Sequence, residues 1–158
     1  MKGDRQQIER LYEQHGRGLI AYACCFVDGF ASAEDVLHQV FERLLRGGIA
    51  IQGSPVPYLY RAVRNAALNY RRNRSRDVAL EDVWLDSPPG MEEAAIILQS
   101  ALMALPQEQR EVITLRIWGQ MTFDEIATTV GIPAKTAESR YRYGLTKLRE
   151  EFRPVTKG

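Results

Sequence analysis

Apolar residues recur along most of this chain at intervals of three and four residues, the spacing that places them on one face of an α-helix. The pattern predicts helices over residues 4–27, 32–46, 56–74, 92–104 and 106–118. Two more helices are predicted within residues 121–152. No alternation of apolar and polar residues predicts a strand, and no internal repeat is present. The expected fold class is therefore all-α.

Breaks between these helices divide the chain into two parts. Residues 47–57 hold three glycines and two prolines, which predicts a loop. Residues 77–91 are acidic and end in Ser87-Pro88-Pro89-Gly90, which predicts a flexible linker with Trp84 as a candidate anchor. We therefore expect two small helical domains, residues 1–76 and 92–158, joined by a linker at 77–91. A chain of 158 residues, 45% of them apolar, can form two such cores.

The stretch from residue 121 to residue 149 has the spacing of a helix-turn-helix. Thr122 and Glu125 stand three residues apart, as in a capping box at a helix start. Gly131 can take the positive φ of a tight turn, and Pro133 favours the first turn of the next helix. Ala127 is small where the two helices would cross. An ordinary amphipathic hairpin is the alternative, but the coincidence of these features favours a DNA-binding motif.

The second helix of this motif has two distinct faces. The face predicted to pack inward carries Ala137, Tyr141, Leu145, Leu148 and Phe152. The opposite face carries side chains that could reach base edges in the major groove, namely Lys135, Thr136, Glu138, Ser139, Arg142 and Tyr143. Arg140, Lys147 and Arg149 lie on the flanks, where contact with phosphates is expected.

The charge of the chain is segregated, although its net value is only +1. Residues 61–76 contain six arginines and no acid, whereas residues 77–93 contain six acids and no base. From residue 134 to the end there are seven bases and three acids. Two basic regions separated by an acidic connector predict contact with a polyanion at two places.

Several classes of protein are not supported by the sequence. No apolar run is long enough for a membrane span, and the N-terminus lacks the order of a signal peptide, so a cytoplasmic protein is expected. Cys24 and Cys25 are adjacent, and we interpret them as core thiols, with redox sensing as the alternative. His15 and His38 are far from any ligand cluster, so no metal is expected. No nucleophile–base pair or phosphate loop is present, so neither an enzyme nor a cofactor is predicted.

Three segments, in this order, resemble the extracytoplasmic-function (ECF) group of the bacterial sigma-70 family, which supplies promoter specificity to RNA polymerase. Residues 33–45 (AEDVLHQVFERLL) are similar to the second conserved segment of that group. Residues 57–76 (PYLYRAVRNAALNYRRNRSR) are similar to its promoter-melting helix, and residues 105–149 to its final domain. The resemblance covers nearly the whole chain. It implies a region 2 domain at 1–76 and a region 4 domain at 92–158.

What the resemblance implies is a sigma factor that binds core RNA polymerase, through the β′ clamp helices and the β flap, and directs promoter recognition and melting. The positions that match the clamp-helix contact are Asp35, Gln39 and Phe41, although Phe41 suits core packing equally well. Those that match minus-10 recognition and melting are Tyr58, Arg61, Arg64, Asn65, Asn69, Arg71 and Arg72. An arginine-dense helix makes an electrostatic track, and Tyr58 or Tyr60 could stack on unpaired bases. Residues 47–54 match a base-capturing loop.

For the minus-35 element, the resemblance implies contacts from the outward face and flanks of the last helix, namely Lys135, Thr136, Glu138, Ser139, Arg140, Arg142, Tyr143 and Lys147. The chain departs from the family pattern at three positions. Glu138 stands where a basic residue is common, Ala137 where a larger aliphatic one is common, and Asn69 where an aspartate is common. A glutamate on the reading face can accept a hydrogen bond from cytosine but repels phosphate.

Three other functions fit the sequence less well than a sigma factor. A sigma mimic that sequesters an anti-sigma factor would not need a basic melting helix or a complete reading face. A stand-alone repressor or activator would need a dimerisation heptad or a ligand domain, and the sequence has neither. An enzyme would need a nucleophile–base pair, a phosphate loop or a metal cluster, and the sequence shows none of these. Whether an anti-sigma factor is also a partner, and which promoters are recognised, stays open.

Overall fold

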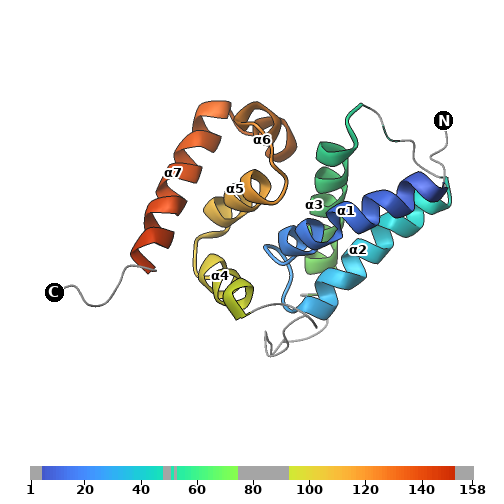
Figure 1. Ribbon diagram of the computed structural model, residues 1–158, viewed down its shortest axis with the longest axis horizontal. Helices are drawn as coiled ribbons and strands as arrows, with labels where there is room; N and C mark the ends of the chain where they lie inside the picture. The colour runs from blue at the N-terminus through green and yellow to red at the C-terminus, as the bar shows by residue number, and fades with distance from the viewer. Residues whose placement is uncertain (1–4, 48–50, 52, 75–92, 152–158) are drawn as a thin grey trace.

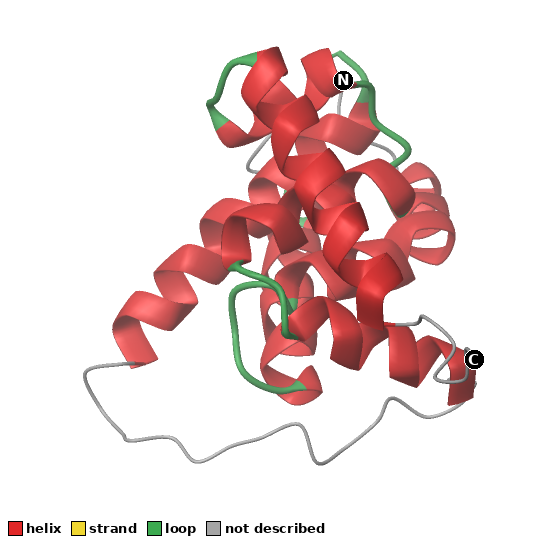
Figure 2. Ribbon diagram, turned by 90° about the vertical axis from the view of Figure 1, so that its left-hand side faces the viewer, coloured by secondary structure: helices red, strands yellow, loops and turns green. Residues whose placement is uncertain are grey.

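The computed structural model describes residues 5–47, 51, 53–74 and 93–151, and these residues form seven helices. They are α1 (Arg5–Ala23), α2 (Phe30–Leu45), α3 (Pro55–Arg74), α4 (Glu93–Met103), α5 (Gln107–Ile117), α6 (Phe123–Val130) and α7 (Ala134–Glu151). Figure 2 shows helices and loops only in the described part of the chain. The all-α prediction is therefore confirmed, and the predicted helices all appear within a few residues of their expected bounds.

The largest difference in bounds is at the end of α1, which was expected to continue to Val27. The helix ends at Ala23, and residues 24–27 form a tighter turn. Cys25 N–H donates to Tyr22 C=O at 2.9 Å, and Phe26 N–H donates to Ala23 C=O at 2.9 Å. Such bonds across three residues are common where a helix ends. Residues 24–27 are buried although they lie beyond the helix, so the apolar pattern of the sequence extends past the end of α1.

Helices α1, α2 and α3 pack against one another and form the first domain. Their shared core contains Leu19, Val36, Leu37, Leu59 and Val63, all of which are completely buried. Asp35 and Gln39 of α2 are exposed. Leu45 continues the apolar spacing of this helix, but it is 45% exposed because it lies at the last position of α2.

Helices α4 to α7 form the second domain, in which α7 packs across α5 and α6 (Figure 1). Val112, Ile113 and Leu115 of α5 are buried, and so are Ala137 and Leu148 of α7, which were predicted to pack inward. Ile117 continues the apolar run of α5, but it is 45% exposed because it lies at the end of the helix. Phe152, the linker at 77–91 with Trp84, and half of the predicted base-capturing loop (residues 48–50 and 52) lie outside the described residues.

The two domains are in contact. Helix α3 lies against α6, and α1 lies against α5 (Figure 1). One cluster of buried apolar side chains runs across both domains and includes Leu59 and Tyr60 of α3 together with Met121 and Ile126 of the second domain. The sequence predicted two separate bodies, because each apolar face could equally have been assigned to its own domain.

Candidate nucleic-acid interface

The helix-turn-helix forms from α6 and α7, and its local geometry is the one predicted. Glu125 N–H donates to Thr122 Oγ1 at 3.1 Å, and Thr122 N–H donates to Glu125 Oε1 at 2.9 Å, which completes the capping box. Gly131 has φ 83° and ψ 40°, a left-handed conformation in which glycine is favoured. Its N–H donates to Ala127 C=O at 2.8 Å. The turn therefore sets the direction in which α7 leaves α6.

Arg116 of α5 holds the two helices of the motif together. Its guanidinium lies 4.5 Å from the centre of the Phe123 ring and 5.9 Å from the centre of the Tyr141 ring. The two rings meet edge to face at 5.5 Å, and Arg116 also donates to Met121 C=O at 2.7 Å. A cation over aromatic faces is stabilising, and more so when it is partly shielded from water. Sequence analysis missed this arginine because its partners lie in two other elements.

The outward face of α7 is accessible along its length. Lys135, Glu138 and Arg142 are exposed, and Tyr143 is 65% exposed, while Thr136 and Ser139 are half-buried. On the flanks Lys147 and Arg149 are exposed, and Arg140 is half-buried. On the inward side Gly144 packs so tightly that an added Cβ would lie 2.5 Å from Ile113 Cδ1. The predicted reading face is thus available to a ligand.

Helix α3 presents a second polar face. Arg61, Asn65, Asn69, Arg71 and Arg72 are exposed as predicted, and Tyr58 is half-buried. The exposed residues from Asn65 onward line a hollow together with Leu68. Arg72 Nη2 donates to Asn69 Oδ1 at 2.5 Å, which orients the amide. This face has the cations and amides that a single strand of nucleic acid requires.

Two residues of α3 differ from the prediction. Tyr60, suggested as a base-stacking residue, is completely buried, and its ring lies 5.5 Å from that of Tyr22. Arg64, matched by the resemblance to the melting surface, turns toward the second domain, and its side chain is only 23% exposed. It turns inward because Glu111 of α5 offers a carboxylate beside it. The exposed face of α3 therefore excludes Arg64.

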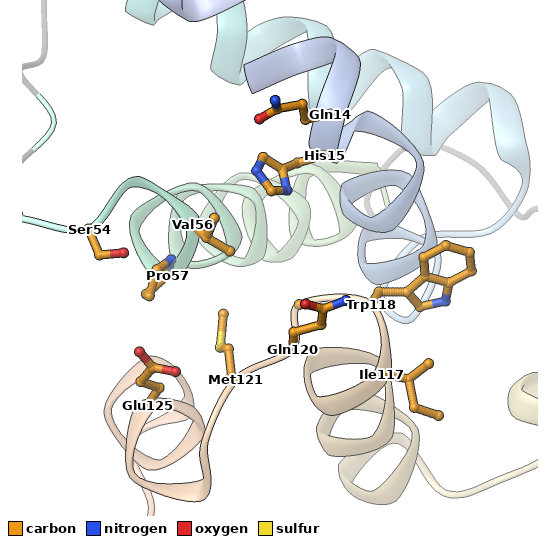
Figure 3. Close-up of a pocket in the computed structure, with 11 residues that line it drawn as sticks. Gln14, His15, Ser54, Val56, Pro57, Ile117, Trp118, Gln120, Met121 and Glu125 are labelled. Atoms are coloured by element: carbon orange, nitrogen blue, oxygen red, sulfur yellow. The ribbon is translucent and has the colours of Figure 1, made fainter. Parts of the chain in front are cut away.

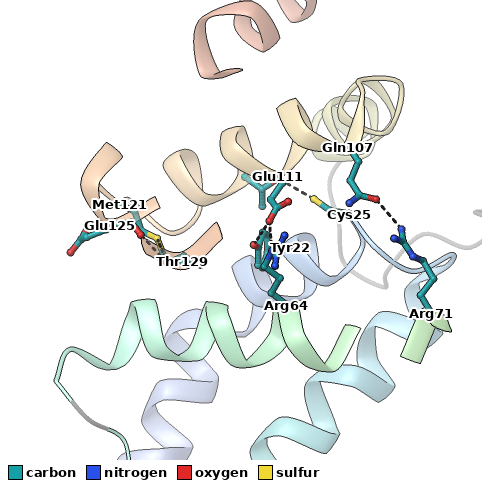
Figure 4. Close-up of polar contacts among 10 residues, drawn as sticks. Tyr22, Cys25, Arg64, Arg71, Gln107, Glu111, Met121, Glu125 and Thr129 are labelled. Atoms are coloured by element: carbon teal, nitrogen blue, oxygen red, sulfur yellow. Dashed lines mark hydrogen bonds and ion pairs between the residues drawn. The ribbon is translucent and has the colours of Figure 1, made fainter. Parts of the chain in front are cut away.

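Glu111 is the centre of a polar contact between the domains (Figure 4). Its Oε2 accepts hydrogen bonds from Arg64 Nε at 2.5 Å and from Tyr22 Oη at 2.9 Å. The Glu111 side chain is only 4% exposed, so the charge is held by these partners and not by water. We call Tyr22, Arg64 and Glu111 the Glu111 contact. It joins α1 and α3 of the first domain to α5 of the second.

The Glu111 contact changes the acid–base behaviour of its members. Burial, reinforced by the Glu111 carboxylate, raises the pKa of Tyr22 well above its ordinary value. Burial alone would lower the pKa of Arg64, but its bond to Glu111 outweighs that effect and raises the pKa. Both groups therefore keep their protons at neutral pH. The contact consists of one cation, one neutral phenol and the carboxylate between them.

Further polar bonds cross the same boundary. Arg71 Nη1 donates to Gln107 Oε1 at 2.8 Å (Figure 4), and Arg110 Nη1 donates to Cys25 C=O at 3.2 Å. Cys25 Sγ lies 3.5 Å from Thr114 Oγ1. Sequence analysis missed all the α5 residues involved. One signal was available, since Glu111 stands four residues before Leu115 and so shares a helical face with a core residue.

The two thiols are buried and free, as the core interpretation predicted. Burial raises the pKa of Cys24 and the pKa of Cys25 to about 12 each. A thiol is nucleophilic only as thiolate, so neither is reactive at neutral pH in this arrangement.

The residues proposed for polymerase binding are not equally accessible. Asp35 and Gln39 are exposed on α2, and Asp35 Oδ2 accepts a hydrogen bond from Tyr70 Oη at 3.5 Å. Phe41 is only 4% exposed and packs edge to face on Tyr12, with ring centres 5.1 Å apart. The structure therefore assigns Phe41 to the core, and the surface available to a partner is carried by Asp35 and Gln39.

A cleft lies at one end of the boundary between the domains (Figure 3), with a volume of about 620 Å³. Gln14 and His15 of α1 and Pro57 of α3 face Gln120, Met121 and Glu125 across it. The domains are thus closely packed at the Glu111 contact and less so at this end. Among the described residues, no helix is both long and apolar enough to cross a membrane.

Two small helical domains, one with a basic helix and the other with a helix-turn-helix, define a class of two-domain nucleic-acid-binding proteins. Comparison with known families is more specific. Residues 11–77 match Sigma-70 region 2, and residues 101–150 match Sigma-70, region 4.

Curated relatives extend over nearly the whole chain. The ECF RNA polymerase sigma factor SigM of Mycobacterium tuberculosis is 30% identical over 143 residues, which are 87% of this chain and 73% of the relative. The RNA polymerase sigma-E factor of Streptomyces avermitilis is 28% identical over 156 residues, which are 95% of this chain and 87% of the relative. The chain belongs to the ECF group of the sigma-70 family of RNA polymerase sigma factors.

Solved structures agree on the fold. The sigma factor RpoE of Bartonella quintana, in complex with the anti-sigma factor NepR, has a TM-score of 0.77 at 19% identity, covering 97% of this chain and 100% of that one. CnrH in complex with the cytosolic domain of CnrY has a TM-score of 0.66 at 21% identity, covering 98% of this chain and 92% of that one. The fold described above is therefore shared with these two solved structures.

Proposed function

We propose that this chain acts in the cytoplasm as a sigma factor, which binds core RNA polymerase and directs it to a set of promoters read at two elements. The observation that carries the proposal is the presence, on one chain that matches both sigma regions, of two separate polar faces with exposed cations, on α3 and on α7. Neither face has the features of a catalytic site, so the proposed role is non-enzymatic.

For the minus-35 element we propose the outward face of α7. Lys135, Arg142 and Tyr143 are exposed there, and a single helix fits the major groove. Arg142 is the best candidate for a bidentate contact with guanine, because its exposed guanidinium lies in the middle of the helix. Arg140, Lys147 and Arg149 suit phosphate contacts, which add affinity without sequence preference.

For the minus-10 element and melting we propose the exposed face of α3. Asn65 and Asn69 offer amide groups, and Arg61, Arg71 and Arg72 offer charge for the backbone of a displaced strand. Tyr58 is half-buried and near the start of the helix, where a base could stack on it. We place the boundaries of the two functional domains at residues 1–76 and 92–158.

For core polymerase we propose a docking surface on α2 around Asp35 and Gln39, with the β′ clamp helices as its partner, and a second contact between the region 4 domain and the β flap. The solved sigma factor RpoE described above was found in complex with an anti-sigma factor. We propose a protein of that class as a further partner of this chain.

The test is a runoff transcription assay with the cognate core polymerase. Promoters for it can be found by sequencing the transcripts that rise when the chain is overproduced, since direct targets should share a pair of upstream elements. The expected result is a transcript of defined start that requires both the chain and the core enzyme. Binding to an anti-sigma protein without any promoter-directed transcript would instead support a sigma mimic.

A further inference from the structure

We propose that Glu138 and Arg142 of α7 act as a pair that selects a cytosine and a guanine at neighbouring positions of the minus-35 element. The carboxylate accepts a hydrogen bond from the cytosine, and the guanidinium donates to the guanine. The inference rests on the proposed function for the use of α7 in the major groove. It goes further, because it states which bases this chain selects and gives an acidic residue a share in the selection.

The first observation is where the two side chains lie. Both are exposed on α7, and they stand four residues apart. Residues at this spacing are neighbours on the surface of a helix, with Cβ atoms about 5–6 Å apart. Glu138 begins the second turn of α7, and the N-terminal part of a recognition helix is the part that contacts base edges. An acid and a cation therefore enter the same part of the groove together.

The second observation is that the two charges are not joined to each other. Glu42 and Arg46 of the first domain have the same spacing and the same order along a helix, and an ion pair joins them at 3.2 Å. In the part of the chain that the structure describes, no ion pair joins Glu138 to Arg142. Exposed pairs of this kind are weak even where they form. Both groups are thus available to bases.

The third step is the match between these side chains and a C·G pair. In the major groove cytosine offers its N4 amino group as a donor, whereas guanine offers O6 and N7 as acceptors. A carboxylate only accepts hydrogen bonds, and a guanidinium only donates them. Base pairs are stacked roughly 3.4 Å apart, so Cβ atoms about 5–6 Å apart reach bases within two base-pair steps of each other. The pair therefore predicts a cytosine and a guanine within two steps.

Glu138 also selects by exclusion. Opposite guanine or thymine its oxygens would meet O6, N7 or O4, which are acceptors as well. Adenine has an amino group, but its N7 acceptor lies beside that group and repels the carboxylate. A desolvated carboxylate without a donor is costly, and a negative charge opposes binding to phosphates in any sequence. An acid at this position therefore favours binding only where a cytosine compensates.

Packing on the inward side of α7 fixes the side on which Glu138 projects. Gly144 lies so close to α5 that an added Cβ would be 2.5 Å from Ile113 Cδ1. The Tyr141 ring meets the Phe123 ring of α6 edge to face, with centres 5.5 Å apart. Rotation of α7 about its axis would break both contacts. The carboxylate therefore cannot be carried away from the DNA without disturbing the motif.

The test is a selection experiment with holoenzyme assembled from the full-length chain and the cognate core polymerase. The probe is a pool of duplexes that carry one promoter of the chain, found by transcript sequencing, with its minus-35 element randomised. For the parent we expect enrichment of a cytosine and a guanine within two steps. Glutamine pairs with N6 and N7 of adenine, so Glu138→Gln should lower the ratio of cytosine to adenine at its position about tenfold. Arg142→Ala should instead lose the preference for guanine.

A second measurement separates selection from damage to the fold. Glu138→Gln removes a negative charge from the DNA-binding face, so it should bind a duplex without the element more tightly than the parent does. A damaged helix-turn-helix would lose affinity for that duplex as well as base preference. Glu150→Gln, at an exposed acid near the other end of α7, is the matched control and should leave the base preference unchanged.

The outcomes distinguish this inference from the proposed function. If the parent selects an element but the ratio of cytosine to adenine is the same in Glu138→Gln, the inference is wrong and the proposed function stands. An element without cytosine, or an equal shift in Glu150→Gln, would also overturn the inference alone. If the parent holoenzyme selects no element at all, both fail.

Discussion

The polar faces of the two domains differ in whether their cations are exposed or bonded to the rest of the chain. On α7, Lys135, Arg142 and Lys147 are exposed to solvent, and the inner face is fixed by Arg116 and by the close packing at Gly144. On α3, Arg64 and Arg71 are instead hydrogen-bonded to residues of α5. The comparison indicates that the face proposed to read the minus-35 element is exposed in the free chain, whereas the face proposed for melting is partly bonded to α5 of the same chain.

The largest effect is expected from Arg142→Ala, on the exposed face of α7. Loss of one bidentate base contact costs about 1–3 kcal/mol, so transcription from a duplex promoter should fall roughly 10- to 100-fold. Core polymerase binding through α2 should be unchanged, because Arg142 lies on the outward face of α7 in the other domain. Runoff yields and a core-binding titration measure the two effects. A loss of core binding in this variant would contradict the division of labour between the domains.

Lys147→Ala is the matched control for that experiment. Its exposed side chain is proposed to contact a phosphate, so its removal should weaken binding to all DNA sequences alike and reduce the salt slope of binding by about one. A change in sequence preference for Lys147→Ala would contradict the assignment of the flank to phosphate contact.

The second-largest effect is expected from Asp35→Ala, in the other domain. The exposed carboxylate is proposed to meet the β′ clamp helices, and loss of a charged contact at an interface typically costs about 1–2 kcal/mol, or roughly tenfold in affinity for core polymerase. Promoter DNA binding by the free chain should stay the same. Glu42→Ala removes another carboxylate of α2, one paired with Arg46 at 3.2 Å on the surface, and should have little effect. Equal losses in both variants would point to a non-specific charge effect.

Arg71→Ala and Arg72→Ala should each slow open-complex formation by a smaller factor, about fivefold, which corresponds to roughly 1 kcal/mol of barrier. A template with a pre-melted bubble should restore most of the loss, since the proposed role is to hold the displaced strand. The two variants also sharpen the comparison between the domains. Arg71 is bonded to Gln107, so Arg71→Ala should additionally favour opening of the chain. No rescue by the bubble would count against a melting role for α3.

The smallest effect is expected from Thr122→Ala at the start of α6. Loss of a capping side chain costs about 1 kcal/mol of unfolding free energy, measured by urea denaturation. Thr128→Ala, on the exposed side of the same helix, should cost less because its hydroxyl is bonded only to Asp124 C=O within the helix. A larger loss for Thr128→Ala than for Thr122→Ala would show that the capping box is not what fixes the motif.

Sequence analysis predicted the features that depend on neighbouring residues. The capping box at Thr122, the left-handed Gly131 and the two faces of α7 all follow from local spacing, and the structure confirms them. Predictions that depended on distant partners were less successful. Arg64 and Tyr60 have the right residue type for an exposed nucleic-acid face, but Glu111, 47 residues further along from Arg64, and the packing of α1 decide where they lie. The spacing of residues within α3 contains no information about these distant partners.

The most direct test of this account is to lock the two domains together, because Arg64 and Arg71 then stay bonded to α5 and the face proposed for melting stays partly occupied. In the Cys24→Ser chain, Thr114→Cys places a second thiol beside Cys25, since Thr114 Oγ1 lies 3.5 Å from Cys25 Sγ. Oxidation should then link α5 to the end of α1 by a disulfide. The account predicts that the oxidised chain gives no promoter-directed transcript with core polymerase and that a reductant restores it. Full transcription by the linked chain would contradict the claim that its domains must separate to read a promoter.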